Sequence, residues 1–400
     1  MTEASFSPSV RRRALLLAGA AAALPVRAQQ RIFSLGLLSQ ADDARYDAQA
    51  LQQGFPDAPA GRSAPAAQIA LNDSLIKLQM ASWTSTRLLT SEAPDAAGVP
   101  AALQQLVLKG VRHVILELPA AGVAAATAAA AGQDVILFNA AAPEDALRAA
   151  QCAPHLLHTL PSHAMQMDAI AQLLVARKWI RPLVLTGPTP ADRLLISAWQ
   201  RSAKRFGVRP VAEKAFRLSN DPRERDLGNV RLLTSDRDYD AVVVLDAQGE
   251  FAREVPYRTV LPRPVLGSNG LVAQAWSPFH ERYGAPQLSR RFLRRTQRPM
   301  GSYDWATWMA ARSAAEVAGA FNKSTVAQQL QALRQGAIAV DGYKGQRLSY
   351  RAWDGQLRQP LLLAHGGGIA DMAPIEGFLH PRSVLDTLGY DAPESGCRIP

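Results

Sequence analysis

The alternation of short apolar runs with longer helical stretches constrains the fold of this chain most. A stretch with helical spacing over 100–109 leads into an apolar run at 111–116, and an Ala-rich stretch over 120–131 leads into another run at 134–138. Successive helix–strand units of this kind are typical of a parallel sheet wrapped by helices. The sequence therefore predicts an α/β fold.

The same pattern starts again after Pro161. Ser162 is expected to cap a helix over 163–178, and strands are expected at 182–186 and 240–245. A chain of this length exceeds what one hydrophobic core usually serves. We therefore expect a two-lobed clamshell that closes on a ligand by a hinge, each lobe being a parallel sheet flanked by helices.

In the last third of the chain, the sequence predicts helices first and strands after them. A β-hairpin is expected at the turn residues Asp354 and Gly355, with strands over 345–353 and 358–363. The tail at 376–400 has little periodicity and is expected at the surface. The helices are expected at three stretches: 285–297, 303–321 and 324–335.

The N-terminus has the layout of a secretory signal at residues 1–28. Three arginines at 11–13 precede an apolar run over 14–24, and Val26 to Ala28 resembles a cleavage site. The run is about 11 residues, and a helix needs about 20 to span a bilayer. We expect a periplasmic protein; Arg12 and Arg13 leave the choice between general secretory and twin-arginine export open.

Charge and motifs exclude several function classes. The formal net charge is +10, of which the signal region carries +3, and the remaining arginines are scattered along the chain. No zinc-finger or RNP-like spacing is present, so a nucleic-acid partner is not expected, although a positive field favours acidic partners or an anionic ligand. No G-x-S-x-G elbow or arguable Ser-His-Asp set points to a hydrolase. We expect no enzyme activity and no cofactor.

Cys152 and Cys397 are the two cysteines of the chain. In an oxidising compartment two cysteines most simply form one disulfide, which would tie the C-terminal tail to the middle of the chain. Two free thiols are the alternative.

The candidate ligand-binding residues follow the ends of the expected strands or begin a late helix. In open parallel sheets, ligands bind beyond the carboxyl ends of the strands. This rule places the following residues at the cleft: Glu117, Asn139, Asp192, Asp246, Ser268 and Asn269. Glu250, four residues after Asp246, and Tyr303, beside Asp304 in a late helix, are added as candidates.

A metal site is left open. A helix over 247–254 would place Asp246 and Glu250 on one face, where they and Glu117 and Asp192 would offer oxygen ligands to a hard cation. The alternative is that Asp246 caps that helix and Glu250 is solvated. The seven histidines have no zinc-ligand spacing.

Several segments carry a resemblance to a known family. The layout resembles type I periplasmic substrate-binding proteins of ABC transporters, with lobe crossings at 158–162, 270–278 and 343–350. More closely, the chain resembles the substrate-binding proteins encoded with PQQ-dependent alcohol dehydrogenase systems. The matching segments are 137–148 with Cys152, 157–165, 238–251, 255–271, 343–360 and 385–397.

The resemblance implies a monomeric periplasmic receptor that works with an ABC permease and ATPase in alcohol oxidation. The ligand is left open among a metal ion such as a lanthanide, a PQQ-like compound and an alcohol-derived solute. The alternative is a regulatory or sensory module with a degenerate cleft, and import is not distinguished from export. The expected division is a signal peptide at 1–28, a first lobe at 29–157 plus 277–340, a second lobe at 158–276 plus 341–375, and a tail at 376–400.

Overall fold

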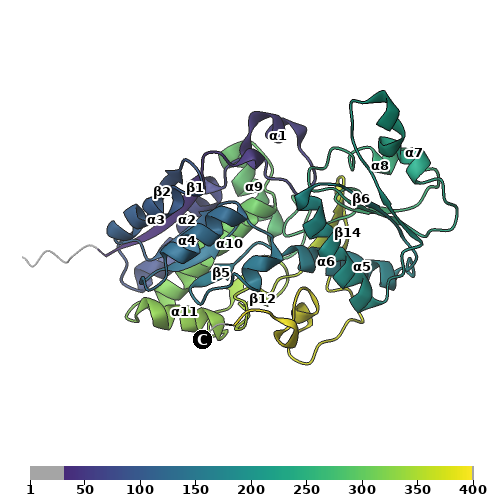
Figure 1. Ribbon diagram of the computed structural model, residues 1–400. Coiled ribbons are helices and arrows are strands. Elements are labelled where there is room, and N and C mark those ends of the chain that lie inside the picture. The colour runs from purple at the N-terminus through teal and green to yellow at the C-terminus, as the bar shows by residue number, and fades with distance from the viewer. Residues whose placement is uncertain (1–30, 399–400) are drawn as a thin grey trace, which may run out of the picture. The chain divides into compact units, whose positions relative to one another are not determined.

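The computed structural model describes residues 31–398 and contains two parallel sheets, each wrapped by helices (Figure 1). The α/β prediction is therefore confirmed. The predicted signal at 1–28 lies outside the described residues. Within them, no helix is long and apolar enough to cross a bilayer.

The first sheet has five parallel strands in the order β2-β1-β3-β4-β5. Its central strands are almost wholly buried, which explains their near-continuous apolar sequence. The strands are β1 (Ile32–Gln40), β2 (Ser85–Ala93), β3 (His113–Glu117), β4 (Ile136–Asn139) and β5 (Leu156–His158).

Long helices cover both faces of the first sheet. Alternate residues of a strand point to opposite faces, so Ile115 joins one core, and Val114 and Leu116 join the other. Helices α2 (Ala64–Met80) and α10 (Ser302–Ala320) pack side by side on the first face, and α3 (Val99–Leu108) and α4 (Ala120–Ala129) cover the second (Figure 1). We call this sheet with its helices the first module.

The late helices belong to the first module. Helix α9 (Ala285–Thr296) packs on α2, and α11 (Val326–Arg334) packs on α10. Thr325 caps α11, since its hydroxyl accepts a bond from the Gln328 backbone N–H. The three predicted late helices are confirmed. A short helix α1 (Ala48–Gln53) lies in the connection from β1 to α2.

The second sheet has four parallel strands in the order β7-β6-β8-β9. Ser162 caps the N-terminus of the helix that leads into this sheet, as predicted. The strands are β6 (Leu183–Thr186), β7 (Ala212–Ala215), β8 (Val242–Leu245) and β9 (Val265–Gly267).

The two faces of the second sheet are covered unequally. Helices α5 (His163–Ala176) and α6 (Pro190–Phe206) pack together over one face. Only short elements cover the other face in the described residues: the 3-10 turn Pro222–Gly228, α7 (Val230–Leu233) and α8 (Val255–Arg258). We call this sheet with α5 to α8 the second module.

The β-hairpin predicted around Asp354 is present only as a tight turn. Tyr350 and Leu357 form an antiparallel bridge, flanked by bonds from the Arg351 N–H to the carbonyl of Gln356 and from the Arg358 N–H to the carbonyl of Ser349. The longer strands predicted over 345–353 and 358–363 do not pair with each other: β12 (Arg347–Leu348) pairs with β11 (Val340–Asp341), and β13 (Leu361–His365) pairs with β14 (Gly368–Ala373) and β10 (Val272–Gln274). The buried side chain of Arg351 donates to the carboxylate of Asp386 and the carbonyl of Leu388, so contacts with the tail hold this segment.

The tail is less superficial than predicted. Asp386 and Leu388 are fully buried, because the guanidinium groups of Arg351 and Arg358 both hold the Asp386 carboxylate. The tail, yellow in Figure 1, passes α6, where Arg201 donates to the carbonyl of Gly389 at 2.6 Å. The predicted disulfide between Cys152 and Cys397 is confirmed.

Candidate functional site

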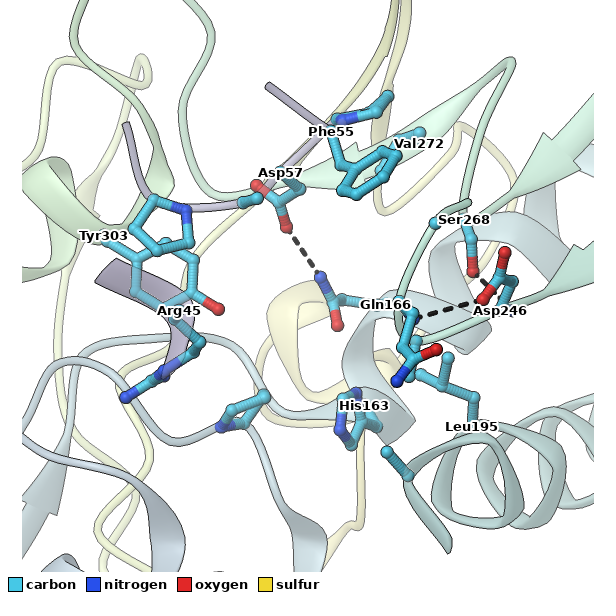
Figure 2. Close-up of a pocket in the computed structure, with 18 of the residues that line it drawn as sticks. Arg45, Phe55, Asp57, His163, Gln166, Leu195, Asp246, Ser268, Val272 and Tyr303 are labelled. Atoms are coloured by element: carbon cyan, nitrogen blue, oxygen red, sulfur yellow. Dashed lines mark hydrogen bonds between the residues drawn. The ribbon is translucent and has the colours of Figure 1, made fainter. Parts of the chain in front are cut away.

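A cavity of about 510 Å³ lies where loops of the first module face loops of the second. Its walls come from the segments that follow the carboxyl ends of β1, β3, β4, β8 and β9 and from the start of α5. Open parallel sheets bind ligands at this edge. In Figure 2, Arg45 and Tyr303 lie on one side, Asp246, Ser268 and Leu195 lie on the other, and Asp57 and Gln166 lie between them.

Carboxylates dominate the charged groups of this cavity. Arg45 is the one arginine or lysine among its described lining residues, and both carboxylate oxygens of Asp43 accept its N–H groups. A third N–H donates to the carbonyl of Ala141. The guanidinium also lies 5.6 Å from the Tyr303 ring centroid. The five lining carboxylates are Asp42, Asp43, Asp57, Glu144 and Asp246.

Asp57 links the two modules. One of its carboxylate oxygens accepts the side-chain amide of Gln166, on α5, at 3.0 Å, and the other accepts the hydroxyl of Ser302, at the start of α10. Burial raises the pKa of Asp57 to about 7, although both hydrogen bonds and the charge of Lys344 favour its ionised form.

Phe55 lies in the same loop and contacts the second module. The Arg253 guanidinium lies 4.7 Å from the Phe55 ring centroid and donates to the carbonyl of Gln53 at 2.6 Å. Gly249 has φ +79°, and a Cβ there would lie 2.8 Å from the Phe55 ring. We call residues 53–59 the cleft loop, because its contacts span the cavity from one module to the other.

Asp246 and Ser268 line the cavity and hold a turn. The Asp246 N–H donates to the Ser268 hydroxyl at 2.9 Å, and the Asp246 carboxylate accepts the N–H groups of Gln248 and Ala252. Burial is the main cause of the raised pKa of Asp246. The carboxylate therefore orders the 246–252 turn as well as facing the ligand space.

The predicted helix over 247–254 is wrong. This stretch forms turns, and the helix α8 begins only at Val255. The positive φ of Gly249 and the two N–H bonds to the Asp246 carboxylate shape a loop rather than a helical turn. Glu250 is consequently exposed and does not line the cavity, so it shares no face with Asp246.

Four other predicted residues hold the scaffold instead of lining the cavity. Glu117 is buried and accepts the Ser63 N–H at 2.7 Å, with its pKa raised by burial. Asp192 accepts the N–H groups of Thr189 and Ala247. The remaining two are Asn139, whose side chain bonds the backbone of Ala141 and Ala142, and Asn269, which donates to the carbonyl of Ala252.

Of the eight predicted site residues, Asp246, Ser268 and Tyr303 line the cavity. The carboxylates suggested for a metal do not converge: no group of three His, Cys, Asp or Glu side chains able to hold a metal occurs within residues 31–398. Glu117, Asn139 and Asp192 follow strand ends but are fully buried away from the cavity, and each accepts a backbone N–H, from Ser63, Ala142 and Thr189 respectively.

The sequence interpretation missed several lining residues on both modules. The strand-end rule, extended to the first strand, would have found Asp42, Asp43 and Arg45, which follow Gln40. No pattern marked the others. They are Phe55, Asp57, Glu144, His163 and Gln166.

Comparisons with known proteins find the fold but no sequence family. No family model and no curated protein matches the chain. A periplasmic binding protein from Burkholderia mallei superposes with a TM-score of 0.64 at 12% identity, covering 92% of this chain and 98% of that one. A leucine-, isoleucine-, valine-, threonine- and alanine-binding protein from Brucella ovis, in a closed conformation, gives a TM-score of 0.68 at 11% identity over 92% and 99%.

A third neighbour was solved with an aromatic acid. The solute-binding protein of an ABC transporter from Rhodopseudomonas palustris, in complex with 3,4-dihydroxybenzoic acid, has a TM-score of 0.58 at 14% identity, covering 83% of this chain and 92% of that one. These neighbours are binding proteins rather than enzymes. The chain thus has the two-lobed α/β fold of type I periplasmic binding proteins.

Proposed function

We propose that this protein is a periplasmic solute receptor that presents a small ligand to an ABC permease and its ATPase. The observation that carries the proposal is the 510 Å³ cavity, which both modules line with loops from the carboxyl ends of their strands. Its size and mixed apolar and polar lining suit a small organic ligand. The fold shared with solute-binding proteins supports the same role.

The proposed lobes are 29–157 plus 277–340 and 158–276 plus 341–375, which meet at three crossings. The first crossing, 158–162, runs beside the segment 357–359 that follows the third, since Leu357 donates its N–H to the carbonyl of His158 at 2.8 Å, and the side chain of Gln359 donates to the carbonyl of Thr159 at 2.8 Å. A ligand that contacts both lobes would favour a closed arrangement about these crossings, because it binds that arrangement more tightly.

Ligand binding is tested first with a broad thermal-shift screen of the purified protein. The screen contains amino acids, amines, organic acids, alcohols, PQQ, calcium and a lanthanide. A ligand at one hundred times its Kd stabilises the folded state by about 2.7 kcal/mol. Ala191→Trp, which places a large ring in the exposed cavity wall at the start of α6, should abolish the shift.

The regulatory alternative has one observation in its favour. The cleft loop already spans the cavity through Asp57, Phe55 and the Arg253 contacts, so part of the ligand space is occupied by the chain itself. The same screen is run on the parent protein and on Phe55→Ala, a variant that lacks the cleft-loop contacts. If no compound changes the melting temperature of either protein, this alternative is favoured over a receptor.

The link to PQQ-dependent alcohol oxidation rests on the sequence resemblance. If the link holds, deleting the gene in its host should slow growth on alcohols but leave growth on a non-alcohol carbon source unchanged. A strain complemented with Ala191→Trp distinguishes ligand binding from other roles, because the blocked receptor should fail to restore growth. Equal growth of all strains on alcohols would contradict the link.

A further inference from the structure

From the cavity chemistry we infer that the ligand is a small organic cation: an ammonium group on an apolar body, without a carboxylate. This inference rests on the proposed receptor function and names the ligand class of the same cavity. The Arg45–Asp43 pair is neutral as a unit. Four further carboxylates then leave the remaining charge of the lining negative: Asp42, Asp57, Glu144 and Asp246.

Many hydrogen-bond donors of the walls are missing or already used, and the hydroxyls of Ser268 and Tyr303 and the side-chain amide of Gln248 remain. Proline has no backbone N–H, and prolines recur around the cavity. At the 246–248 turn, the three backbone N–H groups already donate to Ser268, Asp192 and Asp246. The side-chain amide of Gln166 already donates to the carboxylate of Asp57 and to the carbonyl of Ala273. The lining prolines are Pro56, Pro59, Pro119 and Pro143.

An acceptor, by contrast, is left over. Within the described residues, Oε2 of Glu144 is a buried atom with no hydrogen-bond partner; the buried Nδ1 of His163 also has none, and it donates or accepts according to the tautomer of the ring. An unpaired buried carboxylate oxygen is costly, and an ammonium N–H would satisfy it. A carboxylate ligand would add a negative charge beside these groups and find few free donors.

Burial raises the pKa of Asp57 and of Asp246, which agrees with this inference because a cationic ligand would favour the ionised form of both carboxylates. The groups facing Asp57 are Ser302 and Tyr303 on α10, Gln166 on α5 and the buried Lys344, whose side chain donates to Gln359 and the carbonyl of Pro360. Lys344 does not line the cavity, so a bound ammonium group would be the counter-charge on the ligand side.

The apolar part of the lining defines the rest of the ligand. Phe55, Leu160 and Met167 line the cavity, as do Ile170, Leu195 and Val272. These side chains suit an aliphatic or aromatic body of the size that about 510 Å³ admits.

Two matched trios of ligands test the charge requirement by isothermal titration. One trio is leucine, 3-methylbutylamine and 4-methylpentanoate; the other is phenylalanine, 2-phenylethylamine and 3-phenylpropionate. Within each trio the apolar body is constant, and only the ammonium and carboxylate groups change. We expect the amine to bind at least tenfold more tightly than the amino acid, and the acid to give no heat.

Variants locate the binding. Asp57→Asn and Glu144→Gln should each weaken amine binding at least tenfold, whereas Glu250→Gln, the same change at an exposed carboxylate outside the cavity, should leave it unchanged. Circular dichroism checks that each variant is folded. Equal weakening by Glu250→Gln would mean that a general surface charge effect, and not the cavity, governs binding, and would overturn the inference.

The outcomes separate the ligand class from the receptor function. If an acid or an amino acid binds as tightly as the amine, and Ala191→Trp abolishes that binding, the cationic class is overturned and the receptor function stands. If no compound in the trios or in the broad screen binds, both are overturned. Preferential amine binding that Ala191→Trp abolishes supports both.

Discussion

The two modules contain the same kind of parallel sheet but differ in the helices that pack on its faces. The first sheet is enclosed between two layers of long helices, and α10 alone buries residues along nearly its whole length. The second sheet has long helices on one face and only short turns and helices of four residues on the other. Exposed apolar side chains gather in those short elements, among them Leu227, Leu232 and Tyr257. The first module is therefore built as a rigid frame, and the second has one face that repacks more easily.

Matched core truncations test this difference and carry the largest expected effect. Phe138→Ala in the first sheet should lower the free energy of unfolding by about 4 kcal/mol, because closely packed long helices cannot fill the cavity it leaves. Phe216→Ala, on the thinly covered face of the second sheet, should cost about 3 kcal/mol or less, because the short elements can collapse onto the space. Urea unfolding followed by far-UV circular dichroism measures both, and a larger loss for Phe216→Ala would contradict the comparison.

The disulfide couples the modules through the tail. Cys152 lies between β4 and β5 of the first sheet, and the tail that carries Cys397 contacts α5 and α6 through Asp168, Arg201 and Arg205. Cys397→Ser should lower the free energy of unfolding by about 2–4 kcal/mol, because the unfolded chain loses a long-range constraint. Cys152→Ser is the matched control and should cost the same. A reductant should destabilise the parent protein and leave either variant unchanged; a reductant effect on the variants would contradict this assignment.

Asp57, which links the two modules, should make the free energy of unfolding depend on pH. The folded state holds the Asp57 proton up to about pH 7, whereas an ordinary aspartate releases it near 3.8. Between these values the folded state binds more protons, so the free energy of unfolding falls as pH rises, by at most about 1.4 kcal/mol per pH unit, and this contribution is constant above pH 7. Asp57→Asn should remove this slope. The charge of Asp57 also acts to raise the pKa of Lys344 and of Tyr303, so the difference between the two pH profiles reports Asp57 together with its coupling to these groups.

Unfolding at pH 4.5, 5.5, 6.5 and 7.5 measures that difference. Glu250→Gln serves as the control for a change of one exposed carboxylate. Parallel pH profiles for the parent protein and Asp57→Asn would show that burial of Asp57 does not shape the stability.

Helix caps give the smallest expected effect. Thr189→Ala in the second module removes a cap whose partner, Asp192, also holds the Ala247 N–H, and should cost about 1 kcal/mol. Thr325→Ala, an exposed cap in the first module, should cost about 0.5 kcal/mol. Thermal or urea unfolding compares the two. Equal losses would show that the Asp192 link adds nothing to the cap.

Local patterns were reliable where local physics decides the structure. The Ser162 cap and the late helices follow from spacing and capping chemistry within a few residues, and the structure has them. The failures came where distant segments compete. The hairpin around Asp354 is limited to a tight turn, beside which the Arg351 side chain bonds to a buried tail 35 residues away, and the 246–252 turn forms around one carboxylate instead of a helix.

The sequence by itself determined that this chain builds two parallel α/β sheets, and it favoured one disulfide between the tail and the middle over two free thiols. Both follow from residue types and spacing along the chain. Only the tertiary structure decided which polar groups face the ligand space. Glu117 and Asp246 both follow buried strands, yet the first is held by Ser63 and Tyr46 and the second faces the cavity. A carboxylate becomes a ligand group only where backbone donors from remote segments leave it accessible, and no spacing within one strand and its loop encodes that.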